Sequence, residues 1–248
     1  MDKSQEAKDK RQEAGSGSSG WPLARPLLRA VLAVCVFALL FTSTVTALAY
    51  NPRFYAFLHE RNRVAERAGA PWWYPDATAH AMISYFGSPA SDLPGAFVQY
   101  SLPADFFNER ELKHMKDVRD LIWFDQWVQG AAAAVGIAAL VAVAFLVRRD
   151  YRRFLLGSLL AGSALTIGFI VLLGLFSMLD FQAFWLMFHL LSFTNDLWQL
   201  DPRTDNLIRM FPAGFFFDAV VLGAMLVGLE AIILAAVSAG LLWGKHNV

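Results

Sequence analysis

Apolar residues gather in four long runs along the chain. Residues 30–49, 127–147 and 154–179 contain no charged side chain, and each reaches the roughly 20 residues that a helix needs to cross a hydrocarbon core of about 30 Å. A fourth run, residues 219–244, is interrupted only by Glu230. Backbone groups in lipid must be satisfied internally, so such runs are expected to be helices. The pattern predicts an all-α membrane protein with four transmembrane helices.

The polar residues lie between and before these runs. Residues 1–20 are charged and then rich in glycine and serine, a composition that cannot bury a core and predicts a disordered tail. Two longer polar segments are predicted to form a small extracytoplasmic domain. The expected order is a cytoplasmic tail (1–25), first span (26–49), outer segment (50–126), second span (127–147), cytoplasmic loop (148–153), third span (154–179), outer segment with an interfacial helix (180–214) and fourth span (215–244).

Basic residues predict the orientation in the membrane. The loop 148–153 reads RRDYRR, with four arginines against one aspartate. Short loops rich in lysine and arginine stay in the cytoplasm. The tail before the first span is also basic, and Lys245 follows the last span. Both termini are therefore expected to be cytoplasmic, with the two long polar segments on the outer face.

Composition adds three constraints. Hydrophobic residues make up 56% of the chain, the formal net charge is zero, and the one cysteine, Cys35, falls inside the first apolar run. A disulfide framework and a cysteine-based metal site are thereby excluded, and nothing indicates a nucleic-acid partner. The ALA at residues 47–49 resembles a signal-peptide cleavage site. The apolar run is longer than the roughly 7–15 residues of a signal sequence, which favours a retained span.

The first outer segment contains a helix with a recognisable start. Asn108 is a good N-cap, and Glu111 three residues later completes a variant of the capping box. His114 and Asp117 then recur at helical spacing on the side that carries Val118 and Leu121. A histidine and a carboxylate one turn apart suit a catalytic site. They equally suit a surface helix in which the histidine merely pairs with Asp117.

The second outer segment begins with an aromatic stripe at helical spacing. The pattern fits a helix lying at the membrane interface or packed under the outer domain. His189 falls at the edge of the stripe, with Asp196 two turns on if the helix continues. Asp201 and Pro202 read as the N-cap and first residue of another helix. The stripe consists of Phe181, Phe184, Trp185, Phe188 and Leu191.

Motifs for several reaction types are missing. The sequence contains no G-x-x-x-x-G-K phosphate loop, no G-x-S-x-G nucleophile elbow and no H-E-x-x-H zinc pair. Any reaction is expected to need neither nucleotide nor covalent serine. Glu230 stands near the middle of the fourth span, where an ionisable residue is a candidate for function. We expect it to hydrogen-bond to Thr166 or Ser163 rather than to relay protons. A proton path usually needs several ionisable groups, and the other three spans contain none.

Two blocks of sequence resemble those of a known family. FNERELKHMKDVRDLI in the first outer segment and FHLLSFTNDLWQLDPRTDNLIRMFPAGFF before the last span look like the signature blocks of the bacterial lipoprotein intramolecular transacylase family, Lit, and of the related uncharacterised four-span membrane proteins. The blocks cover about a fifth of the chain, and the layout of four spans with both blocks outside also matches. The resemblance implies a protein of the bacterial inner membrane.

The resemblance also implies a reaction and a site. The substrate would be a diacylglyceryl-modified lipoprotein whose sn-2 acyl chain moves to its own N-terminal amine, giving a lyso-form lipoprotein without any cofactor or metal. The two histidines of the family correspond to His189 and His114. We expect His189 to be the base and His114 to shuttle protons or orient the glyceryl group. Supporting roles are expected for Asp117 and Asp196 as tautomer-fixing carboxylates and for Asn195, Trp198 and Arg209 as oxyanion or head-group donors.

Two other classes of function compete with this interpretation. A small transporter or channel could use Glu230 and Asp218, and a non-enzymatic scaffold could present the outer domain to a partner. Substituting the paired histidines separates a scaffold from an enzyme. The sequence does not set the oligomeric state, and a monomer is compatible with every feature. His59 and His80 are interpreted as structural or surface residues.

Overall fold

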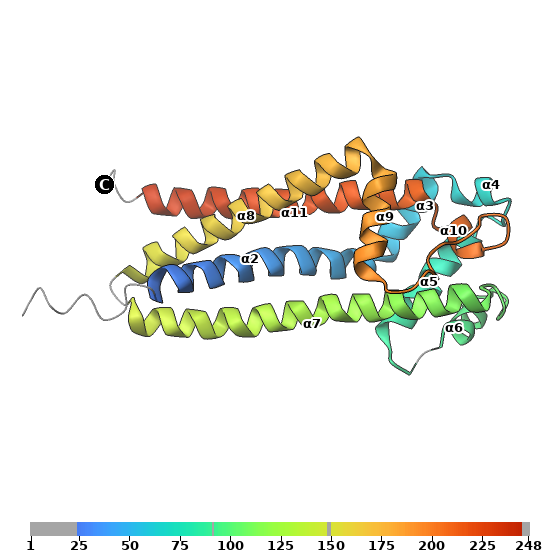
Figure 1. Ribbon diagram of the computed structural model, residues 1–248, viewed down its shortest axis with the longest axis horizontal. Helices are drawn as coiled ribbons and strands as arrows, with labels where there is room; N and C mark the ends of the chain where they lie inside the picture. Colours follow the sequence, from blue (N-terminus) through green and yellow to red (C-terminus); the bar gives the residue numbers. More distant parts are fainter. Residues whose placement is uncertain (1–23, 91, 148–149, 245–248) are drawn as a thin grey trace, which may run out of the picture.

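Four long helices lie side by side, and a cap of shorter helices covers one end of them (Figure 1). The structure is a computed structural model that describes residues 24–90, 92–147 and 150–244. Within this part of the chain, four helices are long and apolar enough to cross a membrane, which confirms the predicted fold class. They are α2 (Ala24–Ala49), α7 (Glu109–Leu146), α8 (Tyr151–Leu179) and α11 (Ala213–Trp243).

Helix α2 is the central member of the bundle. It packs against α7 on one side and α8 on another, and α8 in turn packs against α11. Gly162 of α8 permits the close approach to α2, because a Cβ atom there would lie 2.6 Å from Cβ of Val36 and 2.9 Å from the carbonyl oxygen of Ala33. Small residues at helix crossings allow this kind of contact in lipid, where packing rather than water exclusion drives association.

Helix α7 is longer than any membrane span requires. Its 38 residues extend about 57 Å at 1.5 Å per residue, whereas the hydrocarbon core needs about 30 Å. The chain was expected to hold a surface helix and a separate span from Trp127. Instead one unbroken helix carries both, so the residues before Trp127 project beyond the apolar part of the bundle into the cap. We treat residues 127–146 as the spanning part of α7.

The cap is built from two segments far apart in the sequence (Figure 1). Its core is apolar, with Leu58, Phe97 and Met210 among the buried side chains. Asp218 at the start of α11 holds the end of α3 in place: it forms an ion pair with Arg61 through Nε (2.9 Å) and accepts a hydrogen bond from Asn62 Nδ2 (2.9 Å). The shorter helices are α3 (Pro52–Arg61), α4 (Val64–Ala68), α5 (Tyr74–Gly87), α6 (Leu93–Gln99), α9 (Phe181–Ser192) and α10 (Asn206–Met210).

A buried polar network joins the two halves of the cap. The capping box of α7 forms as predicted, with Asn108 N donating to Glu111 Oε2 (2.7 Å) and Glu111 N donating to Asn108 Oδ1 (3.1 Å). Glu111 is 1% exposed and also accepts from the backbone N–H of Leu207. Asn108 Nδ2 donates to the buried Asp205 (2.8 Å). The start of α7 is thus fastened to the α10 segment.

Three local expectations need correction. Asp201 does not cap a helix: it accepts from the backbone N–H of Arg203 (2.9 Å) in a turn, and α10 starts later, with Asp205 as its N-cap. Helix α9 ends at Ser192, before Asp196. Glu230 accepts from Thr44 Oγ1 of α2 (3.1 Å); neither Thr166 nor Ser163 is its partner, because Thr166 Oγ1 donates within α8 to Gly162.

Glu111 provides the first testable prediction. Glu111→Ala leaves the N–H groups of Asn108 and Leu207 without their acceptor, and unpaired buried donors cost about 1–3 kcal/mol each. We expect the midpoint of thermal unfolding in detergent to fall by roughly 6–12 °C. Glu109→Ala is the matched control in the same turn, since Glu109 is exposed and forms an ion pair with the exposed Lys113. Equal midpoints for the two variants would show that the network does not stabilise the cap.

Candidate functional site

Two histidines from distant parts of the sequence meet at the junction of the bundle and the cap. His114 comes from the second turn of α7, and His189 comes from the last turn of α9. Their ring centroids are 6.2 Å apart and their planes are inclined by 31°. Each side chain is only 6% exposed. The two predicted catalytic residues therefore share one site.

The position of α9 follows from its aromatic stripe. Its N-cap is Asp180, which accepts from the backbone N–H of Ala183 (2.9 Å). Trp185 stacks on Phe216 at the start of α11, with centroids 4.4 Å apart. The opposite side of α9 is exposed, as Leu190 shows at 61%. The helix consequently crosses the bundle where the bundle meets the cap, with one apolar face packed and the other open (Figure 1).

The backbone sets the tautomer of the neutral His189 ring. Its Nδ1 lies 2.7 Å from the carbonyl oxygen of Trp185, one turn earlier in α9. A carbonyl can only accept, so in the neutral ring the proton is on Nδ1 and Nε2 carries a free lone pair. The ring itself is held between the indoles of Trp185 (4.6 Å) and Trp198 (4.7 Å). Nε2 is therefore oriented to accept a proton.

His114 has an unmet hydrogen bond. Its Nδ1 is buried and has no partner among the residues that the structure describes, and its ring meets Phe193 edge-on at 5.1 Å. A buried polar atom without a partner costs about 1–3 kcal/mol, and a functional role is one of the explanations for keeping such an atom. The ring nitrogen is free to bind a polar group of a ligand.

Asn195 connects the two histidine-bearing segments. Its Nδ2 donates to Asp117 Oδ2 of α7 (2.9 Å), while its Oδ1 accepts from the backbone N–H of Leu197 (3.1 Å). Its backbone carbonyl accepts from Trp198 Nε1 (2.9 Å). Because the one N–H of the indole is used in this way, Trp198 shapes the His189 pocket rather than serving as an oxyanion donor.

Two of the expected supporting residues lie elsewhere. Asp196 is exposed and lies 3.8 Å from the guanidinium of Arg110, which also donates to the Asp196 carbonyl. It cannot fix the His189 tautomer, since Trp185 occupies that role. Arg209 donates to the carbonyl of Ala68 and to Asn206 Oδ1 (3.1 Å). It holds α10 against α4, on a part of the cap that the histidines do not touch.

Burial keeps both rings neutral. The pKa of His114 is lowered to about 4, first by burial and then by the neighbouring His189, while Asp117 opposes the shift. Burial likewise lowers the pKa of His189, opposed by its bond to the Trp185 carbonyl. Neutral imidazoles at neutral pH can accept protons, which is the state a general base requires.

Sequence reasoning did not single out the Trp185 carbonyl, Phe193 or Arg110. The Trp185 carbonyl had a detectable signal, because a residue four positions before a helical histidine presents its carbonyl near the ring. Phe193 and Arg110 act through contacts between segments, for which the sequence alone gives no spacing rule. No cluster of three histidine, cysteine, aspartate or glutamate residues that could hold a metal ion occurs among the described residues.

A third buried histidine is separate from the pair. His59 of α3 is 6% exposed, and its ring nitrogens have no hydrogen-bond partner among the described residues. The rings of Phe211 and Phe215 lie 5.2 and 5.1 Å from its own. Burial lowers its pKa to about 4, and the backbone of Met210 offsets this only in part. His59 is a core residue, as expected from the sequence.

Comparisons with known proteins identify a family and a similar fold. The family model described as lipoprotein intramolecular transacylase Lit matches residues 30–216, more than half of the chain. The membrane-integral lipoprotein intramolecular transacylase Lit from Bacillus cereus is a similar solved structure, with a TM-score of 0.76 and 23% identity over 90% of this chain and 98% of that one.

Two variants of the same Bacillus cereus protein are also similar, in which a histidine is replaced by arginine or by alanine. Each has a TM-score of 0.71 and 23% identity over 90% of this chain; 93% and 96% of those chains are covered. The search of curated proteins gives no match.

His59 provides a test of the burial argument. Its folded pKa of about 4 lies below the unfolded value of about 6.5. The unfolded chain binds more protons between these values, so stability is full above about pH 6.5 and is lost as the pH falls toward 4. His59→Phe fits the aromatic surroundings and cannot titrate. We expect unfolding midpoints measured from pH 7 to 4 to fall less steeply in this variant, and an unchanged slope would contradict the buried neutral state.

Proposed function

The chain belongs to the lipoprotein intramolecular transacylase family, Lit, and we propose that its reaction takes place at the His114–His189 pair. The family and the structural likeness support an acyl transfer within a lipoprotein in the membrane. The observation that supports the location most strongly is the meeting of two buried rings, 6.2 Å apart, from segments 75 residues apart. The substrate class is a lipoprotein whose N-terminal cysteine carries a diacylglyceryl group.

The reaction moves one proton, by way of a base, and needs no external reactant. The α-amine of the cysteine attacks the carbonyl carbon of the sn-2 ester, so an N–C bond forms. Nε2 of His189 takes a proton from the amine nitrogen and returns it to the glyceryl oxygen as the ester C–O bond breaks. The products are an amide on the cysteine nitrogen and a free glyceryl hydroxyl. Proton count and atoms balance without water, metal or cofactor.

His114 has a positioning role in this scheme. Its unpaired Nδ1 lies on the ring beside His189 and can hydrogen-bond to the glyceryl group. Amine and ester belong to one molecule, so orientation alone can supply effective molarities of about 10⁵–10⁸ M. Asn195 supports both rings indirectly, because it links Asp117 of α7 to the Trp198 that lies on His189.

The cap is expected to face the outside of a bacterial cytoplasmic membrane. The end of α7 and the start of α8 lie opposite the cap (Figure 1), the sequence around them, residues 148–153, is basic, and short basic loops remain in the cytoplasm. Trp127 of α7 is 78% exposed and Trp243 of α11 is 74% exposed. These two residues fit the aromatic belts at the two surfaces of the bilayer. Both termini would then be cytoplasmic, and lipid is a further partner along the spans.

A transport function receives no support from the ionisable residues of the fourth helix. Asp218 is paired with Arg61 of α3, so it fastens the cap. Glu230 is exposed on α11 and accepts from Thr44. A proton or ion path requires several groups in sequence, whereas these two are engaged in separate contacts.

The histidines can be tested in cells. In a host without lipoprotein N-acylation, the N-terminal lipopeptides identified by mass spectrometry should change from the free-amine diacylglyceryl form to the lyso form when this chain is expressed. His189→Ala should remove the product, and a general base contributes about 10²–10⁴-fold. His114→Ala should reduce it strongly. His59→Phe is the control for loss of a buried histidine and should retain the product.

Lyso-form product at the unsubstituted level in His189→Ala, with matched protein abundance, would remove His189 from the mechanism. The free-amine form persisting with the unsubstituted chain would refute the transacylase proposal itself.

The pH dependence of the rate provides a further test. The substrate amine has a pKa of about 7.7–8.0, and it must be neutral to attack. Because the pKa of His189 is lowered, its ring is neutral and able to accept a proton at pH values well below the pKa of the amine. With a synthetic diacylglyceryl lipopeptide, log kcat/KM should therefore rise with a slope of one across pH 6.5–7.5. A slope of about 1.5 at pH 6.5 that approaches two at lower pH would show a histidine with an ordinary pKa of about 6.5.

A further inference from the structure

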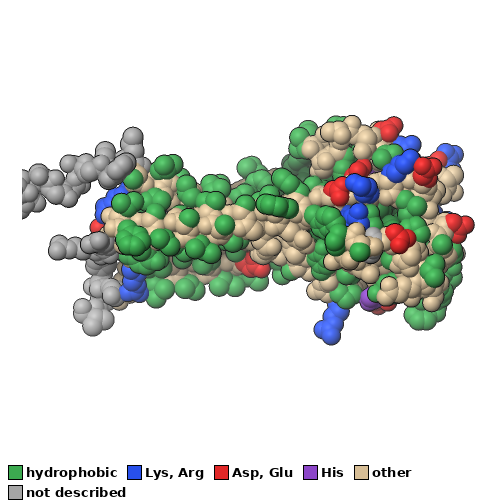
Figure 2. Space-filling model, turned by 90° about the horizontal axis from the view of Figure 1, so that it is seen from below, with side chains coloured by type: hydrophobic (Ala, Val, Ile, Leu, Met, Phe, Trp, Pro, Cys, Tyr) green, Lys and Arg blue, Asp and Glu red, His purple; other side chains and the backbone are tan. Residues whose placement is uncertain are grey.

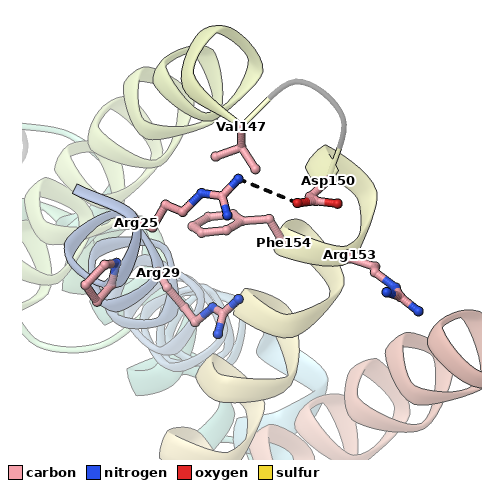
Figure 3. Close-up of a pocket in the computed structure, with 7 residues that line it drawn as sticks. Arg25, Arg29, Val147, Asp150, Arg153 and Phe154 are labelled. Carbon is pink, nitrogen blue, oxygen red and sulfur yellow. Dashed lines mark ion pairs between the residues drawn. The ribbon is translucent and has the colours of Figure 1, made fainter. Parts of the chain in front are cut away.

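The end of the bundle opposite the histidines carries a basic cavity. It has a volume of ≈ 430 Å³ and lies between the start of α2 and the junction of α7 with α8. Figure 3 shows Arg25 and Arg29 of α2 on the same side of the cavity, with the ring of Phe154 beside them. The two arginines are one helical turn apart, which puts both guanidinium groups on one face of α2.

Arg29 is held across the neighbouring helix. Its guanidinium carbon lies 5.1 Å from the centroid of the Phe154 ring. It also passes over Gly157, where a Cβ atom would lie 3.7 Å from Arg29 Nη2. Arg29 forms no ion pair with any other described residue. A guanidinium with five N–H donors and no acid partner is suited to a phosphate, which it can bind through two parallel hydrogen bonds.

Arg25 is only loosely neutralised. Its Nη2 lies 3.5 Å from Asp150 Oδ2, and both side chains are more than half exposed. An exposed ion pair at this distance contributes little. Arg153 also lines the cavity, although its side chain leaves α8 on the side away from Arg29 (Figure 3). The cavity therefore keeps a positive charge that an anion can neutralise.

A second, apolar groove lies further along the same helices, toward the middle of the bundle. It has a volume of ≈ 240 Å³ and runs between α2, α7 and α8. On α2 it begins at Leu32, three residues after Arg29, and on α8 it begins at Leu155, next to Phe154. Its lining is almost wholly hydrocarbon, from residues such as Leu39 and Leu140. Along α2 and α8, a cavity suited to an anion is thus followed by a groove suited to an alkyl chain.

We propose that this combined site binds one anionic phospholipid of the leaflet opposite the histidine pair. Its phosphate would lie between Arg25 and Arg29, and one acyl chain would lie in the groove between α2, α7 and α8. Basic pockets between helices on the cytoplasmic side bind acidic lipid head groups in this way. The site is distinct from the proposed transacylation site, which lies at the other end of the bundle and in the other leaflet.

The binding of phosphatidylglycerol can be measured on the full-length protein in a neutral detergent by native mass spectrometry. The unsubstituted chain should retain one phosphatidylglycerol more strongly than phosphatidylcholine of the same chain length. Arg29→Gln and Arg25→Gln should each weaken retention about fivefold, the effect of one basic residue near an anionic lipid. Arg152→Gln is the matched control, because Arg152 is exposed at the same end of α8 and does not line the cavity.

The outcomes separate the alternatives. Equal weakening by Arg152→Gln and Arg29→Gln would show a general charge effect and overturn the site. Displacement of the lipid by millimolar inorganic phosphate would show a phosphate site rather than a phospholipid site.

A second measurement does not depend on the variants. A phosphatidylglycerol with a diazirine in its acyl chain should label peptides of α2 and α8, and labelling confined to α11 would contradict the groove. Lyso-form production by Arg29→Gln should be unchanged, which distinguishes this site from the transacylation site.

Discussion

The continuous α7 helix is the constraint on which the site depends. In lipid the backbone must pair with itself, so the spanning part of α7 is a regular helix, and the same hydrogen-bond ladder continues without a break to Glu109. The position of His114 relative to the membrane is therefore fixed by a continuous helix and not by a loop. The buried capping box at the start of this helix then fastens the α10 segment through Glu111 and Asp205. The second outer segment is held at both of its ends, by α9 on α11 and by α10 on α7.

This arrangement explains how segments far apart in the sequence form one site. Helix α7 supplies one histidine, and a short aromatic helix lying across the bundle supplies the other. Asn195 spans the gap between them with one hydrogen bond to Asp117. The aromatic rings around His189 exclude water from one side, while the exposed face of α9 offers apolar side chains to lipid. A substrate anchored in the bilayer can reach such a site by moving sideways in its own leaflet.

Features that depend on local spacing were predictable from the sequence. The four apolar runs predicted four long helices, the Asn108–Glu111 pair predicted the start of α7, and the aromatic stripe predicted α9. Helical spacing put His114 on the buried side of its helix. The histidine pair itself came from the resemblance to a family, because no local pattern states that residues 75 positions apart will meet.

Features that depend on packing between segments were not predictable in the same way. Asp196 was expected to follow His189 along a helix, but α9 ends at Ser192 and Arg110 of α7 attracts that segment. Asp201 and Pro202 have the residue types of a helix start, yet Asp201 turns back to Arg203 and Asp205 takes the cap. The partner of Glu230 depends on how α11 lies beside α2. The angle between two apolar helices cannot be predicted from the sequence of either one.

The central claim is that His114 and His189 act as one unit, and a double-substitution cycle tests it most directly. Rates of lyso-form production would be measured for His114→Ala, His189→Ala and the double variant at matched abundance. Residues that act together show strongly non-additive losses. The double variant should therefore be about as active as the weaker single variant. A double variant whose loss equals the product of the two single losses would show that the histidines act independently.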